Sequence, residues 1–253
     1  MQKRRLYTMD KNKVAAVILG VVLIIALAIG SAACNKSNNS AASAVAVGDI
    51  IQMGGYDWRV LEVSGKKALV LSDKVLFRMK YQLPTTGQDF YTSSISLTWD
   101  ECSLRQYLNE EFFNSAFSAE EKKRIVDTTL INNNNPLGEY GEGGSDTTDK
   151  VFLLSIEEVL QYFSDSGVLA QQEILSLVDY QNFINDQFNE IRIAQTQDGE
   201  IAWWWLRSPG ANHWCEGPMV LATSVTKAGS VYVLGEYVTN ENGGVRPALW
   251  LKL

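Results

Sequence analysis

The chain has 253 residues and a formal net charge of −7 at neutral pH. Residues 1–33 carry a charge of +4, so residues 34–253 carry −11. A domain this acidic repels phosphate backbones and anionic headgroups, which argues against nucleic-acid binding and against docking on lipid through a basic patch. The chain has three cysteines, Cys34, Cys102 and Cys215, and a core of this size needs no disulfide framework.

The N-terminal segment has the pattern of a secretory signal, because five lysines and arginines within residues 1–13 precede the uncharged apolar residues 14–33. The tetrapeptide Ser31-Ala32-Ala33-Cys34 resembles a bacterial lipoprotein processing site, except that Ser31 stands where such sites usually carry leucine. The resemblance implies that Cys34 is lipidated. The alternative is an uncleaved helix, since about 20 apolar residues span a bilayer.

Both alternatives export everything after residue 34, which predicts a protein at the cell membrane that faces away from the cytoplasm. Residues 1–34 are then the signal peptide or membrane anchor. Residues 35–46 are small and polar, so we expect a flexible tether. Residues 47–253 are expected to form a single globular extracytoplasmic domain.

The first part of that domain, residues 47–80, predicts a β-meander. Alternation over residues 56–63 places Trp58 and Val60 on one face of a strand. Ser64-Gly65-Lys66-Lys67 predicts a hairpin turn into a buried strand. We expect residues 75–77 to extend that second strand.

Residues 99–126 predict helices, because apolar residues recur at helical spacing and Ser118 with Glu121 forms a capping box. Residues 132–150 have many turn-forming residues and no apolar pattern, which predicts a long surface loop. A second capping box opens a helix that ends at Phe163.

Residues 171–193 predict a further helix, with a break near Asp179. The C-terminal part returns to β-strands, which we expect at residues 203–206, 220–225, 230–233, 236–239 and 245–251. Strands at both ends and helices between them predict an α+β fold in which the two β ends share one sheet.

Several segments resemble a bacterial family catalogued only as domain of unknown function 6273. They are Tyr56–Leu61, Trp99–Arg105, Asp149–Ser155, Trp204–Gly210 and Gly244–Leu249. The resemblance implies a secreted or surface protein and no known activity. At the level of the fold, the Trp-rich strand and the closing Gly-Val-Arg strand are similar to the C-type-lectin-like fold of formylglycine-generating enzymes. The cysteine pair of those enzymes has no counterpart here, because only Cys215 lies in the C-terminal third.

Candidate catalytic residues are few. His213 is the only histidine, and it lies two residues before Cys215 without a recognisable motif around it. A zinc site would need more ligands than His213 and the cysteines supply, so we predict none. Asp146 and Asp149 lie in a segment whose carboxylates and carbonyls could hold calcium, although the spacing differs from that of an EF-hand.

The triplet Trp203-Trp204-Trp205 is unusual, and in a strand Trp203 and Trp205 share one face. Large aromatics are mostly core residues, so we expect two of the three to be buried. Any outward-facing tryptophan would join a candidate ligand-binding surface. That surface comprises Trp203, Trp205, Asn212, His213 and Trp214.

Arg207 and Arg246 lie in otherwise apolar β segments, where a guanidinium must be paired or stacked, so we expect both to be structural. The sequence therefore favours a non-catalytic, envelope-anchored module that binds a glycan, peptide or protein. The alternative is an uncharacterised extracytoplasmic enzyme that uses Cys102, Cys215 or His213.

Overall fold

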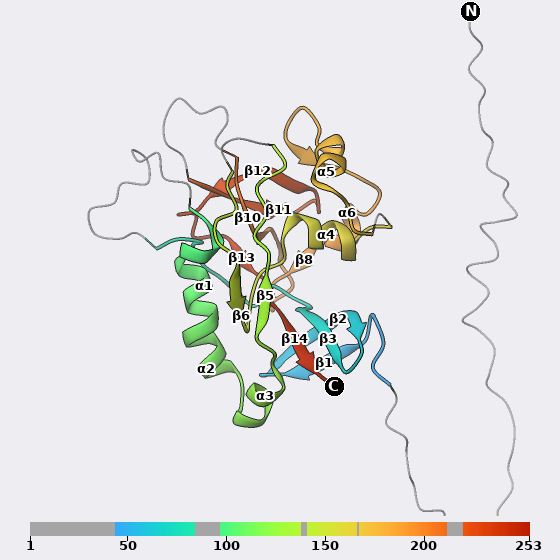
Figure 1. Cartoon of the computed structure of the whole chain (residues 1–253), viewed down its shortest axis with the longest axis vertical. Coiled ribbons are helices and arrows are strands. Elements are labelled where there is room, and N and C mark those ends of the chain that lie inside the picture. The colour runs from blue at the N-terminus through green and yellow to red at the C-terminus, as the bar shows by residue number, and fades with distance from the viewer. Residues whose placement is uncertain (1–43, 84–96, 138–140, 166, 212–219) are drawn as a thin grey trace, which may run out of the picture. The chain divides into compact units, whose positions relative to one another are not determined.

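The computed structural model describes residues 44–83, 97–137, 141–165, 167–211 and 220–253 (Figure 1). Residues Ala44–Leu253 form one compact unit, with strands at both ends and helices in the middle. The predicted α+β fold is therefore confirmed. Within the described ranges no helix is long and apolar enough to cross a membrane; the predicted signal or anchor, with Cys34, lies outside them.

A four-stranded antiparallel sheet joins the two β ends of the unit, as predicted. Its strands, in spatial order, are β1 (Ile50–Met53), β2 (Tyr56–Ser64), β3 (Lys67–Ser72) and β14 (Ala248–Lys252). Gly65 takes a φ of +59° in the turn between β2 and β3, a conformation that favours glycine. Trp58 and Val60 point from β2 into the core.

The second sheet has six strands and lies at the opposite end of the unit in Figure 1. Its strands, in spatial order, are β4 (Phe77–Arg78), β13 (Gly244–Val245), β10 (Trp204–Pro209), β11 (Leu221–Val225), β12 (Val231–Tyr237) and β7 (Phe183–Ile184). Gly235 was expected to be a turn between two strands. It lies instead inside β12 with a φ of +100°, where the register to β11 shifts, so the two predicted strands are one.

The chain crosses between the two sheets twice, and the two crossings lie side by side. Residues 73–76 lead from β3 to β4, and Arg246-Pro247 leads from β13 to β14. The Ser72 amide donates to the Pro247 carbonyl over 2.9 Å. Two predictions are corrected here: residues 75–77 do not extend β3, and residues 245–251 are not one strand, because proline cannot continue a hydrogen-bonded ladder.

The first helical segment runs along one side of the unit (Figure 1) and confirms the predicted helices. It consists of the 3₁₀ turn η1 (Trp99–Glu101), α1 (Ser103–Tyr107), the π-helical turn η2 (Leu108–Phe112), α2 (Phe113–Ala116) and α3 (Ala119–Arg124). The predicted capping box of Ser118 and Glu121 is present at the start of α3. The second capping box, Ser155 with Glu158, starts α4 (Ile156–Tyr162).

The helix predicted over residues 171–193 exists only in its first part, α5 (Gln171–Leu177). Beyond it the chain forms β7 and the short α6 (Asn189–Arg192). The Asp179 carboxylate accepts hydrogen bonds from the amides of Gln181 and Phe183, and Asn182 takes a φ of +65°. An aspartate that bonds to nearby amides competes with the helix, which explains the break predicted near this residue.

The segment 132–150 is not a simple surface loop. Thr147–Asp149 forms β6, which pairs with β5 (Thr128–Leu130). Asn135 is buried, and its side-chain amide donates to the carbonyls of Pro209 and Val233. The polar residues of this segment therefore satisfy buried carbonyls of the second sheet, a long-range role that composition does not reveal. A last ribbon pairs β8 (Ala194–Gln195) with β9 (Ile201–Ala202).

Candidate ligand-binding cavity beside the sheet crossings

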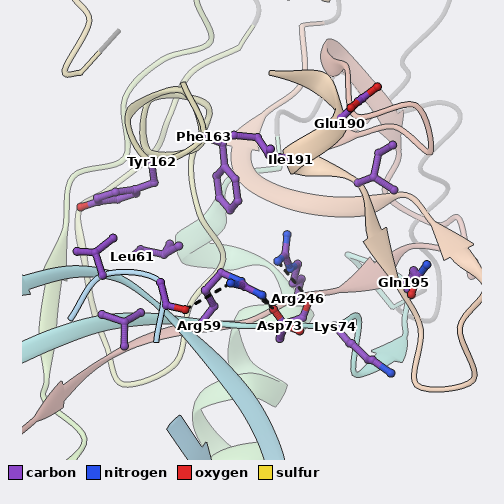
Figure 2. Close-up of a pocket in the computed structure, with 14 residues that line it drawn as sticks. Arg59, Leu61, Asp73, Lys74, Tyr162, Phe163, Glu190, Ile191, Gln195 and Arg246 are labelled. Atoms are coloured by element: carbon purple, nitrogen blue, oxygen red, sulfur yellow. Dashed lines mark hydrogen bonds and ion pairs between the residues drawn. The ribbon is translucent and has the colours of Figure 1, made fainter. Parts of the chain in front are cut away.

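A cavity of about 630 Å³ lies beside the two crossings between the sheets. Separate parts of the chain line it: residues 47–48, 59–61, 73–74, 162–163, 190–191, 193 and 195, together with Arg246. Figure 2 shows Tyr162, Phe163 and Ile191 on one side, opposite Arg59 and Arg246. Its volume falls within the roughly 300–1,000 Å³ typical of small-molecule sites.

Arg246 directly follows β13, at the crossing to β14, and forms part of the wall. Its side chain is 3% exposed. Nε donates to the Ser72 carbonyl over 2.9 Å, and Nη2 donates to the Asp73 carbonyl over 3.3 Å. Nη1 is buried and has no hydrogen-bond partner among the described residues.

Two aromatic rings face the Arg246 guanidinium. Its central carbon lies 5.1 Å from the ring centroid of Trp204 and 5.7 Å from that of Phe163. Burial lowers the pKa of Arg246 from its ordinary value to about 10, and the nearby Asp73 carboxylate acts in the opposite direction. The residue is still a cation at neutral pH, so the wall of the cavity contains a buried positive charge.

A second arginine, Arg59, holds the carboxylate nearest to Arg246. Its Nη2 lies 2.6 Å from Oδ1 of Asp73, and its Nε donates to the same oxygen over 2.8 Å. Lys74 and Glu190 complete the charged side chains of the lining. Three cations against two carboxylates make the lining positive, although the domain around it is acidic.

The rest of the lining is largely apolar, with one tyrosine whose hydroxyl is engaged elsewhere. Tyr162 donates to Oε2 of Glu62 over 2.6 Å. Burial raises the pKa of Tyr162, and the hydrogen bond to the Glu62 carboxylate raises it further. Tyr162 is therefore a neutral wall at physiological pH and not a base. The arrangement suits binding, with apolar walls and a few fixed polar groups.

A family model, described as a domain of unknown function (DUF6273), matches residues 65–253. The chain belongs to the DUF6273 family. The match includes Asp73, Phe163, Ile191 and Arg246 of the cavity, whereas Arg59 precedes it. Comparisons with curated proteins and with solved structures gave no match, so the C-type-lectin-like resemblance stays a prediction.

The tryptophan triplet of this DUF6273 domain lies mainly in the core. Trp204 and Trp205 are fully buried and Trp203 is partly buried, as expected for two of the three. Trp205 donates through Nε1 to the Met79 carbonyl, and its ring centroid lies 4.7 Å from that of Trp203. A fully buried ring offers no surface to a ligand, so Trp205 does not fit the contact role predicted for it.

The other members of the predicted surface, Asn212, His213 and Trp214, lie outside the described residues, as does Cys215. Their proposed role stays a prediction. The structure instead brings together Arg59, Asp73 and Arg246 at a site that the sequence analysis did not recognise. The sequence feature that pointed towards this site was Arg246, an arginine in an otherwise apolar β segment.

Arg207 is buried in β10 and forms an ion pair with Glu158 of α4. Its Nη1 also donates to the Leu153 carbonyl over 3.0 Å, and its Nε donates to Oδ1 of Asn132. These contacts tie α4 and the 132–150 segment to the second sheet. They are the contacts expected of a structural arginine.

Two further candidates occupy the side of the unit formed by α1. Cys102 is a free, buried thiol, and burial raises its pKa from 9.0 to about 12. Asp149 accepts hydrogen bonds from Nε1 of Trp99 and Nε of Arg105. Within the described part of the chain no group of three or more His, Cys, Asp or Glu side chains is placed to hold a metal ion. Calcium at Asp146 and Asp149 stays a prediction.

Proposed function

We propose that this DUF6273 protein is a non-catalytic binding module, held at the cell membrane by residues 1–34 and facing outside the cytoplasm. Its ligand occupies the cavity beside the sheet crossings. The observation that supports this most strongly is the buried Arg246 guanidinium, which lines the cavity with an unpaired Nη1. Buried polar groups are nearly always paired, and an unpaired one at a cavity points to a ligand.

The size of the cavity favours a glycan or a peptide over a protein as the ligand. A volume of about 630 Å³ accommodates a small molecule, a short sugar or a peptide end. A protein partner would instead need a surface of about 800 Å² on each side. We therefore favour a small ligand or a short segment of a larger one.

The burial of Cys102 favours the binding proposal over the enzymatic alternative. A cysteine nucleophile acts as the thiolate, and reactive cysteines have lowered pKa values. Cys102 has a pKa raised to about 12 and is buried away from this cavity. An enzyme would therefore depend on Cys215 and His213.

The binding proposal is tested on the full chain in detergent with a library of small neutral, acidic and basic compounds, sugars and short peptides. Ile191 lines the cavity and is 56% exposed, so Ile191→Trp should fill the cavity without unfolding the protein. Ile131→Trp is the matched control, because Ile131 is exposed and does not line the cavity. We expect calorimetry to detect ligands that Ile191→Trp loses and Ile131→Trp retains. Equal binding to both variants would contradict the proposal.

The membrane proposal is tested by metabolic labelling with a fatty-acid analogue. We expect the wild-type chain to be labelled and Cys34→Ala to be unlabelled. If neither is labelled and both fractionate with membranes, the N-terminal segment is an uncleaved anchor. A soluble wild-type chain without label would overturn the membrane proposal.

A further inference from the structure

We propose that the cavity ligand is a monocarboxylate with an apolar body, whose carboxylate pairs with Arg246. This inference rests on the proposed binding function and adds the chemical class of the ligand. It is carried by the free hydrogen-bond donors of Arg246, by the charge balance of the lining and by the apolar walls.

The free donors lie on one edge of the guanidinium. Arginine has five N–H groups in a planar fork. Nε and Nη2 of Arg246 donate along one edge to the carbonyls of Ser72 and Asp73. The edge formed by Nη1 and the second N–H of Nη2 is left over, and Nη1 is unpaired. Two parallel N–H groups of this kind match a carboxylate.

Arg246 also differs from the other buried arginines of the described chain. Arg192 pairs with Asp186, and Arg207 pairs with Glu158. Among the described residues, Arg246 forms no ion pair with a carboxylate. Its two hydrogen bonds go to carbonyl oxygens, which are neutral. A buried cation without an ion-pair partner is costly, and the Asp73 carboxylate offsets only part of that cost, so an anionic ligand would supply the remainder.

The nearby Asp73 carboxylate supplies only part of that counter-charge, because Arg246 shares it with Arg59. Both nitrogens of Arg59 that contact Asp73 hold its Oδ1. With Lys74 and Glu190 included, the lining carries one more cation than anions. A single negative charge on the ligand would balance it, whereas a phosphate dianion would add repulsion from Asp73 and Glu190.

Phe163 connects the Arg246 guanidinium to the apolar part of the cavity. The Phe163 ring lies against the guanidinium and also lines the cavity. Trp204 lies against the guanidinium too, but it belongs to the core. Figure 2 shows Phe163 and Arg246 facing the same space. A ligand whose carboxylate lies at Arg246 would therefore place its apolar body against the Phe163 ring.

The apolar walls indicate what the carboxylate is attached to. The apolar lining side chains are Val47, Val60, Leu61, Phe163, Ile191 and Ile193. They would bury an aliphatic or aromatic body, at about 25 cal/mol for each Å² of apolar surface removed from water. A free inorganic anion would leave these walls without a partner.

The test compares three probes on the full chain in detergent by calorimetry: N-acetyl-L-leucine, N-acetyl-L-leucinamide and inorganic phosphate. The first two differ only in the charged carboxylate. We expect the acid to bind at least about tenfold more tightly than the amide, as one charge-assisted hydrogen bond implies. We expect phosphate to bind more weakly than the acid.

The matched variants are Ile191→Asp and Ile131→Asp. Ile191→Asp removes one apolar contact for both probes and places a carboxylate at the cavity without altering Arg246, so it should weaken binding of the acid at least about tenfold more than binding of the amide. Ile131→Asp should change neither. Arg246→Gln should also remove the preference for the acid, provided that its melting curve shows a folded protein.

Each other outcome overturns the inference in a distinct way. Equal binding of acid and amide would leave the binding module intact and remove the carboxylate. Tighter binding of phosphate would replace the organic acid with an inorganic anion. No binding of any probe at millimolar concentration would overturn the carboxylate inference, and the compound library with Ile191→Trp then decides separately whether the cavity binds anything.

Discussion

Arg207 and Arg246 are equally buried, but only Arg207 has a carboxylate partner. Arg207 joins Glu158, whose other role is to cap α4. Arg246 is held by two backbone carbonyls and two aromatic rings. The first arrangement is complete within the protein, whereas the second leaves donors and charge for another molecule. The same residue type thus has a structural role at one position and a candidate binding role at the other.

This difference predicts an order of stability for alanine variants. Arg207→Ala leaves the Glu158 carboxylate unpaired and should cost about 3–5 kcal/mol. Arg246→Ala removes two hydrogen bonds but also a buried charge that has no ion-pair partner, so it should cost less, about 1–3 kcal/mol. Urea unfolding measures both. Arg78→Ala is the control, because its ion pair with Glu200 is exposed and should contribute at most about 1 kcal/mol. A larger loss at Arg246 than at Arg207 would contradict this order.

Cys102 predicts a specific dependence of stability on pH. Its pKa is about 12 in the folded chain and about 9 when unfolded, so the folded state retains the proton between these values. The contribution of the thiol to stability is then complete below about pH 9 and is lost as the pH rises towards 12. Unfolding free energies of wild type and Cys102→Ala should therefore converge across this range. A difference that is independent of pH would show that the thiol is not shielded.

Elements were predicted well where the pattern was local. The β2–β3 hairpin and the two capping boxes depend on residues within a few positions of each other, and all are present. The predictions failed where a strand changes sheets, as at Arg246-Pro247, because alternation continues across a change of partner. The helix over residues 171–193 ends at Leu177, close to the break predicted near Asp179, where the aspartate side chain competes for amides. The prediction failed only beyond the break, where the chain forms β7 before the short α6.

Asn109, in the π-helical turn between α1 and α2, ties that turn to residues 150–151. Its Oδ1 accepts from the amides of Lys150 and Val151, and its Nδ2 donates to the carbonyls of Arg105 and Val151. Asn109→Leu should cost about 2–3 kcal/mol in urea unfolding, because several backbone groups lose their partner. Asn114→Ala in α2 is the control: its side chain makes an exposed bond to Glu110, so the loss should stay within about 0.5 kcal/mol. Similar losses for both variants would rule out this role for Asn109.

The cavity itself could not be predicted from the sequence, because it is a property of the whole unit. Its lining residues span from Val47 to Arg246 and meet only when the two crossings lie side by side. The sequence marked Arg246 as an unusual residue in an apolar segment. Nothing local to Arg59, Asp73 or Ile191 indicated that they would join it. A predicted surface of consecutive aromatics was the more visible pattern, and Trp205 proved to be core.

The whole-molecule prediction is that a fragment of residues 150–253 does not fold alone. It contains β14 but lacks β3, to which β14 pairs over five positions, and it contains β13 but lacks β4. It also lacks the Ser72 and Asp73 carbonyls, so Arg246 would be buried without any of its hydrogen bonds. We expect the fragment to show no cooperative melting transition, while the full chain in detergent melts cooperatively. Adding a fragment of residues 44–149 should restore the transition, because the missing strands return with it. A cooperative melt of residues 150–253 alone would show that the second sheet is an independent folding unit, and the cavity would then lie at an interface between two such units.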